Sequence, residues 1–154
     1  KSPVVCLSSG QPGVDPTQRT FQAEDAQLSG SPLPSRSTEN PGYTGSGYVG
    51  LFGYTGQRVT FTVTNVGTHS TYWLSLRERA IETGVVRRVY VNGVDQGLVA
   101  IPQTSTTWTA AAWANAGPMT INLHQGTNTI VVEYAGSNGS GYLDLDSMAP
   151  SVQF

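Results

Sequence analysis

Acidic and amide side chains lie on strand-like stretches at both ends of this chain. In the segment FQAEDAQLSG, Gln22 and Glu24 are two positions apart, a spacing that points both side chains to one face of a strand. Asp144 and Asp146 repeat this spacing in the segment GYLDLDSM. Because the ends of a domain often lie close together, the oxygens of Gln22, Glu24 and Asp146 would converge if the first and last strands were neighbours.

A cation site is one chemistry that such converging oxygens would support. Carboxylates held close together repel one another, and a bound cation removes that cost. Oxygen donors without thiolate or imidazole suit Ca²⁺, which accepts about 6–8 oxygens in loose geometry. Carbonyls of the Gly-rich turn TGSG, residues 44–47, would complete the set. The alternative is that these residues are solvent-facing polar side chains on two edge strands and bind no metal, and spacing alone favours this alternative.

The composition excludes several classes of partner. Charged residues make up 12% of the 154 residues and the formal net charge is −2, so the chain lacks the basic field that nucleic acids or anionic membranes require. The sequence contains no run of about 18 apolar residues, which excludes a transmembrane helix. We therefore expect no nucleic-acid partner, no membrane partner and a monomeric state.

The beginning of the chain has the composition of a linker. Residues 1–19 are rich in Ser, Pro and Gly without periodicity, and the segment KSPVVCLSSG lacks the apolar core of a signal peptide. We interpret the chain as an excised piece of a secreted, extracellular protein, with a linker over 1–19 and one domain over 20–154. Cys6 is the single cysteine, and either it has no role or its partner lies in a neighbouring domain. Together with the distant His69 and His124, it cannot build a zinc or redox centre.

The rest of the chain is typical of short β-strands joined by turns. The 18 Gly and 9 Pro, with many Thr, Ser, Val and Asn, argue against long helices. Period-2 alternation predicts strands over 20–28, 47–52, 57–65, 71–79, 86–92, 106–113, 118–124, 128–134 and 141–147. The pair Asn92-Gly93 predicts a hairpin, and residues 29–46 predict a long loop. These features predict an all-β fold, a β-sandwich or jelly roll of two antiparallel sheets with about 8–9 strands.

Several motifs occur along the chain in the order found in one known family. FQAEDAQLSG is similar to the opening of that family, GYTGSGYVGLF to its Gly-rich second strand, and TYWLSLRERA to its central strand. RRVYVNGVDQG is similar to its Asn-Gly hairpin, and TTW, GTNTI and YLDLDSM to its closing strands. Over residues 20–148 the chain thus resembles carbohydrate-binding module family 35. The resemblance implies a β-jelly-roll that binds sugars without cleaving them, attached to a secreted glycoside hydrolase or polysaccharide lyase.

The resemblance also implies a structural Ca²⁺ that joins the first and last strands. Its ligands would be the side chains of Gln22, Glu24 and Asp146, with a carbonyl near Thr44. The family often has Glu where this chain has Gln22. An amide oxygen still coordinates Ca²⁺, but one negative charge is lost, so the affinity for the ion is expected to be lower.

A sugar site needs a flat aromatic surface and a few directional polar groups. Loops at one end of the predicted sandwich, with the strands beside them, offer Trp108, Asn138, Tyr43, Asp144 and Arg77. The resemblance favours Trp108 and the loop that contains Asn138. Tryptophans also serve packing and strand arginines also form surface ion pairs, so each residue has an alternative role. Asn138 begins an N-glycosylation sequon, and a glycan there would crowd the proposed site.

The two other tryptophans are less informative. Trp73 lies between Tyr72 and Leu74 on a predicted central strand, where packing in the core or on the sheet surface is the expected role. Trp113 either packs under a loop or contributes to the site, and the sequence leaves both open.

Three functions are compatible with these residues. The first is a non-catalytic carbohydrate-binding module that holds a tethered catalytic domain near plant cell-wall polysaccharide. The resemblance implies β-mannan, galactose-containing chains or uronic acids as ligands. Because the candidate loops carry no cluster of Lys or Arg, we expect neutral β-mannan or galactan, with a uronic-acid-binding module of the same fold as the alternative. The second is a stand-alone calcium-dependent lectin or adhesion domain. The third, a small glycosidase, is disfavoured because the remaining acids, such as Glu39, Glu82 and Glu133, are scattered rather than paired.

Overall fold

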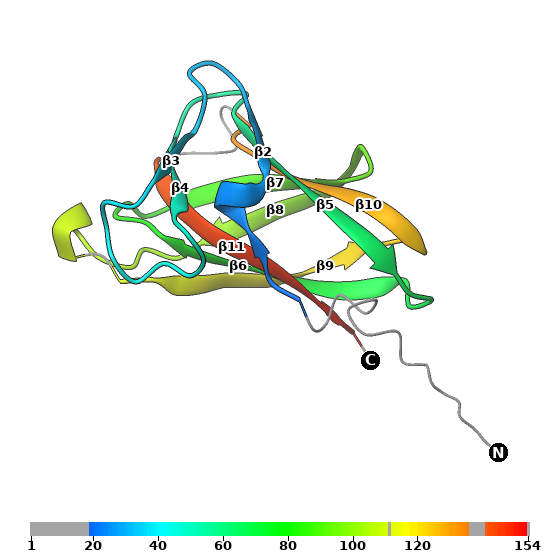
Figure 1. Ribbon diagram of the computed structural model, residues 1–154. Coiled ribbons are helices and arrows are strands. Elements are labelled where there is room, and N and C mark those ends of the chain that lie inside the picture. Colours follow the sequence, from blue (N-terminus) through cyan, green and yellow to red (C-terminus); the bar gives the residue numbers. More distant parts are fainter. Residues whose placement is uncertain (1–18, 111, 136–140, 154) are drawn as a thin grey trace.

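Two antiparallel sheets form the molecule and face each other (Figure 1). The described residues of the computed structural model are 19–110, 112–135 and 141–153. Cys6, Asn138 and all but the last residue of the predicted linker over 1–19 therefore lie outside them. The predicted all-β sandwich is confirmed, with eleven strands in the described residues where about 8–9 were expected. None of the helices in this part of the chain has the length and hydropathy needed to cross a membrane.

The strands divide into a six-stranded and a five-stranded sheet. The first sheet contains β1 (Phe21–Gln22), β3 (Ser35–Ser37), β4 (Tyr48–Phe52), β6 (Thr71–Arg79), β9 (Ala114–Asn122) and β11 (Leu143–Val152). Its order is β3-β4-β11-β6-β9, and β1 pairs with β11. The second sheet contains β2 (Gln27–Ser29), β5 (Arg58–Val66), β7 (Val85–Val91), β8 (Val94–Ile101) and β10 (Gly126–Glu133). Its order is β2-β5-β10-β7-β8.

Alternating side chains of both sheets fill the space between them. On β6, Tyr72, Leu74 and Leu76 are at most 1% exposed, and the residues between them face outward. The same inward row ends in Glu78, which is 0% exposed and whose two carboxylate oxygens have no hydrogen-bond partner. Burial raises the pKa of Glu78 from 4.5 to about 8. The core therefore holds Glu78 in its neutral form at neutral pH.

The first and last strands are neighbours, as the sequence predicted. β1 pairs with β11 in antiparallel register, with Gln22 opposite Ser147. Residues Ala23–Asp25 then form the 3₁₀ helix η3, which carries the chain to β2 in the other sheet. The single strand expected over 20–28 is therefore divided between the two sheets.

Other strand predictions are wrong in ways that the pairing explains. Trp108–Ala110 form the 3₁₀ helix η4, not the strand predicted over 106–113. β9 (Ala114–Asn122) begins earlier than the strand predicted over 118–124. β8 was missed because Gly97 and polar neighbours interrupt its alternation, yet it pairs with β7 along its length. Within the loop predicted over 29–46, β3 forms because it pairs with β4.

Candidate functional site

A surface pocket lies where β3, β4, β6 and β11 meet the segment that contains η4. It has a volume of about 560 Å³. The charged, aromatic and amide side chains on its wall are Glu39, Asn40, Tyr48, Arg79, Trp108, Tyr142 and Asp144. Trp108 and Asp144, which the sequence predicted for a sugar site, therefore line one pocket.

A buried ion pair forms part of the pocket wall. Arg79 on β6 lies opposite Asp144 on β11, and Arg79 Nε donates to Asp144 Oδ2 at 2.7 Å. Arg79 is 2% exposed and Asp144 is 8% exposed. Burial raises the pKa of the Asp144 carboxyl, and the hydrogen bond and charge of Arg79 oppose this rise. The two residues therefore bring compensating charges to the pocket.

Aromatic rings surround the guanidinium group of Arg79. Its Cζ lies 5.2 Å from the centre of the Trp108 ring, 5.4 Å from that of Trp113 and 5.9 Å from that of Tyr48. Tyr48 and Trp113 pack edge to face with centroids 5.4 Å apart, and Trp113 Nε1 donates to the Pro41 carbonyl at 2.9 Å. Trp113 does not line the pocket and supports its wall through these contacts with Tyr48 and Arg79.

Tyr43 and Arg77, also predicted for the sugar site, contact this aromatic wall from outside the pocket. The Tyr43 ring packs on Tyr48, with centroids 5.8 Å apart. The Arg77 guanidinium lies 5.4 Å from the centre of the Trp113 ring and forms an ion pair with Asp146 at 2.9 Å. Neither side chain lines the pocket that contains Trp108 and Asp144.

Of the residues that line the pocket, the sequence singled out Trp108 and Asp144 but not the charged and aromatic side chains of Glu39, Tyr48, Arg79 and Tyr142. Arg79 is two positions after Arg77 on β6, and this spacing was the available signal that both face the same side of the sheet. Tyr142, two positions before Asp144, also lines the pocket. Asp144 was expected near the end of the last strand, but it lies at the beginning of β11. Asn138, the fifth predicted residue, falls outside the described residues.

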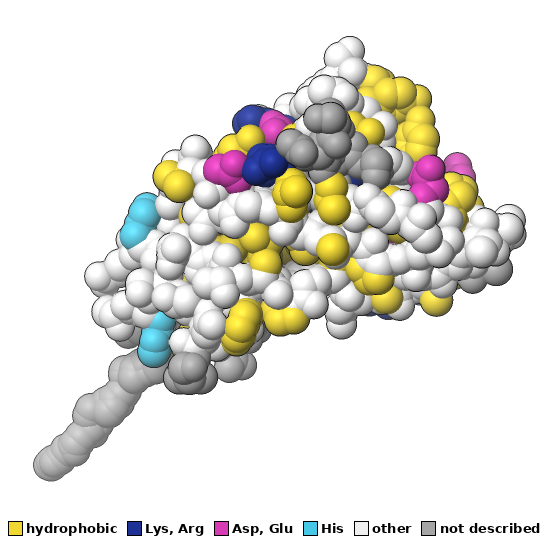
Figure 2. Space-filling view, turned by 180° about the vertical axis from the view of Figure 1, so that it is seen from behind, with side chains coloured by type: hydrophobic (Ala, Val, Ile, Leu, Met, Phe, Trp, Pro, Cys, Tyr) yellow, Lys and Arg dark blue, Asp and Glu magenta, His cyan; other side chains and the backbone are white. Residues whose placement is uncertain are grey.

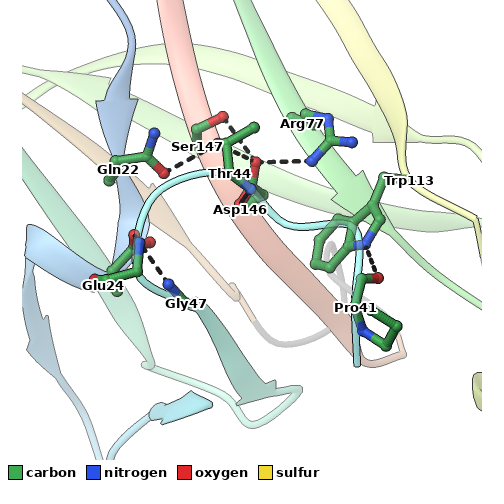
Figure 3. A network of polar contacts seen from close by, with 10 residues as sticks. Gln22, Glu24, Pro41, Thr44, Gly47, Arg77, Trp113, Asp146 and Ser147 are labelled. Atoms are coloured by element: carbon green, nitrogen blue, oxygen red, sulfur yellow. Dashed lines mark hydrogen bonds and ion pairs between the residues drawn. The ribbon is translucent and has the colours of Figure 1, made fainter. Parts of the chain in front are cut away.

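A second cluster of oxygens joins the first and last strands (Figure 3). Asp146 on β11 is 0% exposed and accepts hydrogen bonds from the backbone amide of Thr44 at 2.8 Å and from its hydroxyl at 2.7 Å. Arg77 Nη1 donates to Asp146 Oδ2 at 2.9 Å. The Thr44 hydroxyl also lies 3.2 Å from Gln22 Oε1. Asp146 thus accepts hydrogen bonds from the backbone and side chain of Thr44 and from Arg77.

Glu24 binds the same turn through its carboxylate. Its Oε2 accepts from the backbone amides of Ser46 at 2.9 Å and Gly47 at 3.3 Å, whereas its Oε1 is buried without a hydrogen-bond partner. A Cβ on Gly45 would lie 2.8 Å from Gln22 Oε1 and closer still to Glu24 Oε2. The turn approaches both side chains because Gly45, with a φ of 67°, has no side chain.

The cluster, which we name the junction site, offers donors that hard cations prefer. It brings the predicted side chains of Gln22, Glu24 and Asp146 to the turn that contains Thr44. In the part of the chain that the structure describes, no three Asp, Glu, His or Cys side chains group to hold a metal. A cation would therefore also need amide, hydroxyl or carbonyl oxygens, as Ca²⁺ accepts. The unpartnered Oε1 of Glu24 fits such a role.

Comparison with known proteins gives relatives of two kinds. No family model matches the sequence. The chain is 35% identical over 134 residues to a mannan endo-1,4-beta-mannosidase of Thermothelomyces thermophilus, covering 86% of this chain and 25% of that protein. It is 33% identical over 129 residues to an isomaltosyltransferase of Sporosarcina globispora, covering 84% of this chain and 11% of that protein. The chain thus spans a quarter or less of these relatives.

A solved structure matches nearly end to end. A family 35 carbohydrate binding module from Clostridium thermocellum superimposes with a TM-score of 0.71 and 27% identity, covering 88% of this chain and 98% of that chain. The chain forms a two-sheet sandwich, matches a stand-alone binding module and corresponds to only a small part of a larger enzyme. Together these findings define a carbohydrate-binding module. The ordered motifs and this match confirm the resemblance: in sequence and fold the chain is similar to carbohydrate-binding module family 35.

Proposed function

We propose that the module binds a neutral cell-wall polysaccharide, with β-mannan as the first candidate and galactan as the second. The observation that carries this proposal is the charge balance of the pocket. Arg79 is paired with Asp144, and among the described residues Glu39 is the one other charged side chain on the wall. A uronic acid would need a positive charge that is not already compensated. Trp108 supplies the flat surface on which the C–H face of a sugar can pack.

The relatives support this ligand class. One is named as a mannan endo-1,4-beta-mannosidase, which favours β-mannan as the ligand. The other is named as an isomaltosyltransferase, which favours isomaltosyl saccharides as an alternative neutral ligand. Both kinds of saccharide therefore belong in the binding test.

The proposed role of the module is to hold a catalytic domain of a secreted parent protein near its substrate. Tethering raises the local concentration of the catalytic domain at the polysaccharide and requires no chemistry in the module itself. In this proposal the module acts as a monomer, because one pocket on one chain is sufficient for binding.

We also propose that the junction site holds a structural Ca²⁺ through the side chains of Gln22, Glu24 and Asp146 and the carbonyl of Thr44. Arg77 already compensates the charge of Asp146, whereas Glu24 Oε1 has no hydrogen-bond partner. A cation next to Glu24 would satisfy that oxygen. Because neither Glu24 nor Asp146 lines the saccharide pocket, the ion is expected to act on stability rather than on sugar contacts.

Affinity gels with β-mannan, galactan, an α-1,6-glucan and polygalacturonate test the ligand class. We expect retardation by at least one neutral polysaccharide, none by polygalacturonate, and no release of reducing sugar. Strong retardation by polygalacturonate alone would contradict the charge-balance argument, and released reducing sugar would contradict a purely binding role.

A pair of tryptophan variants tests the pocket. Trp108→Ala removes the aromatic surface on the pocket wall, so we expect binding to the retarding polysaccharide to fall roughly tenfold or more. Trp73→Ala is the matched control, because Trp73 is 37% exposed on β6 but does not line the pocket. Equal affinity of the Trp108→Ala variant and the wild type would place the sugar elsewhere.

A further inference from the structure

Exposed hydrophobic side chains continue the saccharide pocket toward the tip of the molecule. Leu51 and Tyr142 line one wall of the pocket and are 44% and 38% exposed. Tyr54, in the turn between β4 and β5, packs on Tyr142 and is 39% exposed. We name these three residues the apex cluster. The surface view shows hydrophobic side chains gathered beside the tip, on a face with few charged ones (Figure 2).

A buried glutamine fixes the backbone that carries the apex cluster. Gln57 is 0% exposed, and its Oε1 accepts from the backbone amides of Gly53 and Tyr54, both at 2.8 Å. Its Nε2 donates to the carbonyls of Leu51 at 2.7 Å and Pro32 at 2.8 Å. The exposed side chains of Leu51 and Tyr54 are therefore displayed by an ordered segment, which lowers the entropy cost of binding to them.

The Tyr142 ring is held in one orientation by the backbone of Gly53. A Cβ on Gly53 would lie 2.6 Å from Tyr142 Cε1 and 2.7 Å from Tyr142 Cγ. The Tyr54 ring packs against it at an interplanar angle of 82°, with centroids 5.6 Å apart. One side of the Tyr142 ring is thus supported by protein, while the ring remains open at the pocket wall. A fixed aromatic ring with an open surface is the form that sugar platforms take.

Leu51 adopts a backbone conformation that hydrophobic residues rarely use. Its φ is 52°, in the left-handed region, which costs about 1 kcal/mol or more for a residue with a Cβ. The strain leaves an apolar side chain 44% exposed at the pocket wall instead of burying it. Backbone strain of this kind is held by the surrounding structure and collects at binding sites and other functional positions.

We propose that the apex cluster is a second subsite, which binds further sugar units of the same neutral polysaccharide chain that packs on Trp108. This inference rests on the proposed function of the pocket. Leu51 and Tyr142 belong to both the pocket wall and the cluster, so a chain that leaves the pocket on this side meets the cluster without a gap. No member of the cluster is charged, as expected for a surface that packs on the C–H faces of neutral sugars. The module therefore prefers long chains to short ones.

Calorimetric titrations with β-1,4-manno-oligosaccharides, from mannobiose to mannohexaose, test the subsite on the full chain. For the wild type, we expect the affinity to rise with chain length until both subsites are filled. For Tyr54→Ala, whose ring does not line the pocket, we expect unchanged affinity for the shortest ligand bound and a loss of roughly tenfold for mannohexaose. Tyr142→Ala should lose at least as much affinity for mannohexaose. Tyr142→Phe keeps the aromatic ring, so its affinity should still rise with the length of the oligosaccharide.

Gly53→Ala provides a sharper test, because it leaves the Tyr142 ring in the protein but displaces it. The φ of Gly53 lies outside the left-handed region, so the added Cβ acts by displacing the Tyr142 ring and not through backbone strain. We expect the same loss for mannohexaose as in Tyr142→Ala. Thermal unfolding of each variant checks that it is folded, and Trp73→Ala is the control for an exposed aromatic residue elsewhere.

The outcomes separate this inference from the proposed function. If Trp108→Ala lost binding at all lengths while the Tyr142→Ala and Gly53→Ala variants kept the full rise in affinity, the subsite would be rejected and the pocket would stand. If the wild-type chain bound none of the oligosaccharides and none of the neutral polysaccharides, the pocket and the subsite would both be rejected.

Discussion

Arg79 and Asp144 lie opposite each other on β6 and β11, and their buried ion pair, with 2.7 Å between Nε and Oδ2, lies beside the Trp108 ring. The variant Asp144→Asn leaves the Arg79 charge buried without its counter-ion. We expect the free energy of unfolding to fall by about 3 kcal/mol, because an uncompensated buried charge is costly. Urea unfolding followed by tryptophan fluorescence measures this loss.

The same variant changes the charge of the pocket. Because Asp144→Asn removes the group that compensates Arg79, we expect the variant to gain affinity for polygalacturonate. Affinity gels in polygalacturonate compare it with the wild type, and added salt should weaken the gained binding. If the variant is folded and still does not bind polygalacturonate, the charge of Arg79 does not determine ligand specificity.

Gly45 tests the calcium proposal without removing a ligand. A Cβ in the variant Gly45→Ala would enter the space next to Gln22 Oε1 and Glu24 Oε2. Bound Ca²⁺ at 100 times its dissociation constant stabilises a protein by about 2.7 kcal/mol. We expect the wild type to show a higher melting temperature in Ca²⁺ than in a chelator, and the Gly45→Ala variant to lose this difference.

Gly56→Ala is the control for backbone strain. Gly56 has a φ of 87°, yet a Cβ there would meet no atom within 4 Å. This variant should lose about as much intrinsic stability as any left-handed Gly→Ala change and keep its full response to Ca²⁺. An equal melting temperature of the wild type with and without Ca²⁺ would argue against an ion at the junction site.

Glu78 makes stability depend on pH. Its pKa is about 8 in the folded protein against an ordinary value of 4.5. Between these values the unfolded chain has lost the proton and the folded protein keeps it. Stability therefore falls as the pH rises through this window, by at most about 1.4 kcal/mol per pH unit.

The variant Glu78→Gln removes this titration. We expect urea unfolding at pH values within the window to show a falling midpoint for the wild type and a flatter one for the variant. The control variant Asp25→Asn, at an exposed acidic residue, should show the same dependence of the urea midpoint on pH as the wild type. Parallel slopes for the wild type and the Glu78→Gln variant would mean that Glu78 is charged in the folded protein.

Gln57 connects stability and binding at the apex cluster. The variant Gln57→Met fills the same space but leaves the amides of Gly53 and Tyr54 and the carbonyls of Leu51 and Pro32 without their partner. We expect a loss of about 3 kcal/mol in unfolding free energy, because buried polar groups left unpaired are costly. At temperatures where the variant is folded, its affinity should fall more for mannohexaose than for mannobiose.

Most of the fold could be predicted from the sequence, because strand alternation and turn residues are local features of the chain. Alternation on the segment over 71–79 predicted β6 with the observed bounds, and Asn92-Gly93 predicted the hairpin that joins β7 to β8, where both residues have positive φ. The break at η3 was not predicted, because the alternating pattern around Ala23 continues through a turn that only the two-sheet arrangement requires.

Part of each candidate site was predictable from residue type. Trp108 and Asp144 carry chemistry that can be recognised by residue type, and the structure places both on one pocket wall. Gln57 could not be recognised, because its four hydrogen bonds go to the backbone of segments whose approach depends on the fold. The partner of Arg79 likewise depends on the register of β6 against β11, which no local pattern fixes.

The pairing of β1 with β11 decides how the module can be joined to other proteins. Asp144 faces the pocket near the beginning of β11, and Val152 lies roughly 25 Å further along the same strand at the usual rise per residue. β1 runs antiparallel to β11 and pairs with its middle, at Ser147 and Met148, so polypeptide attached before β1 or after β11 would leave in the same direction, away from the pocket. This arrangement leaves the pocket open when the unit is part of a longer polypeptide, and the similar segments make up a quarter or less of proteins as different as a mannosidase and a transferase.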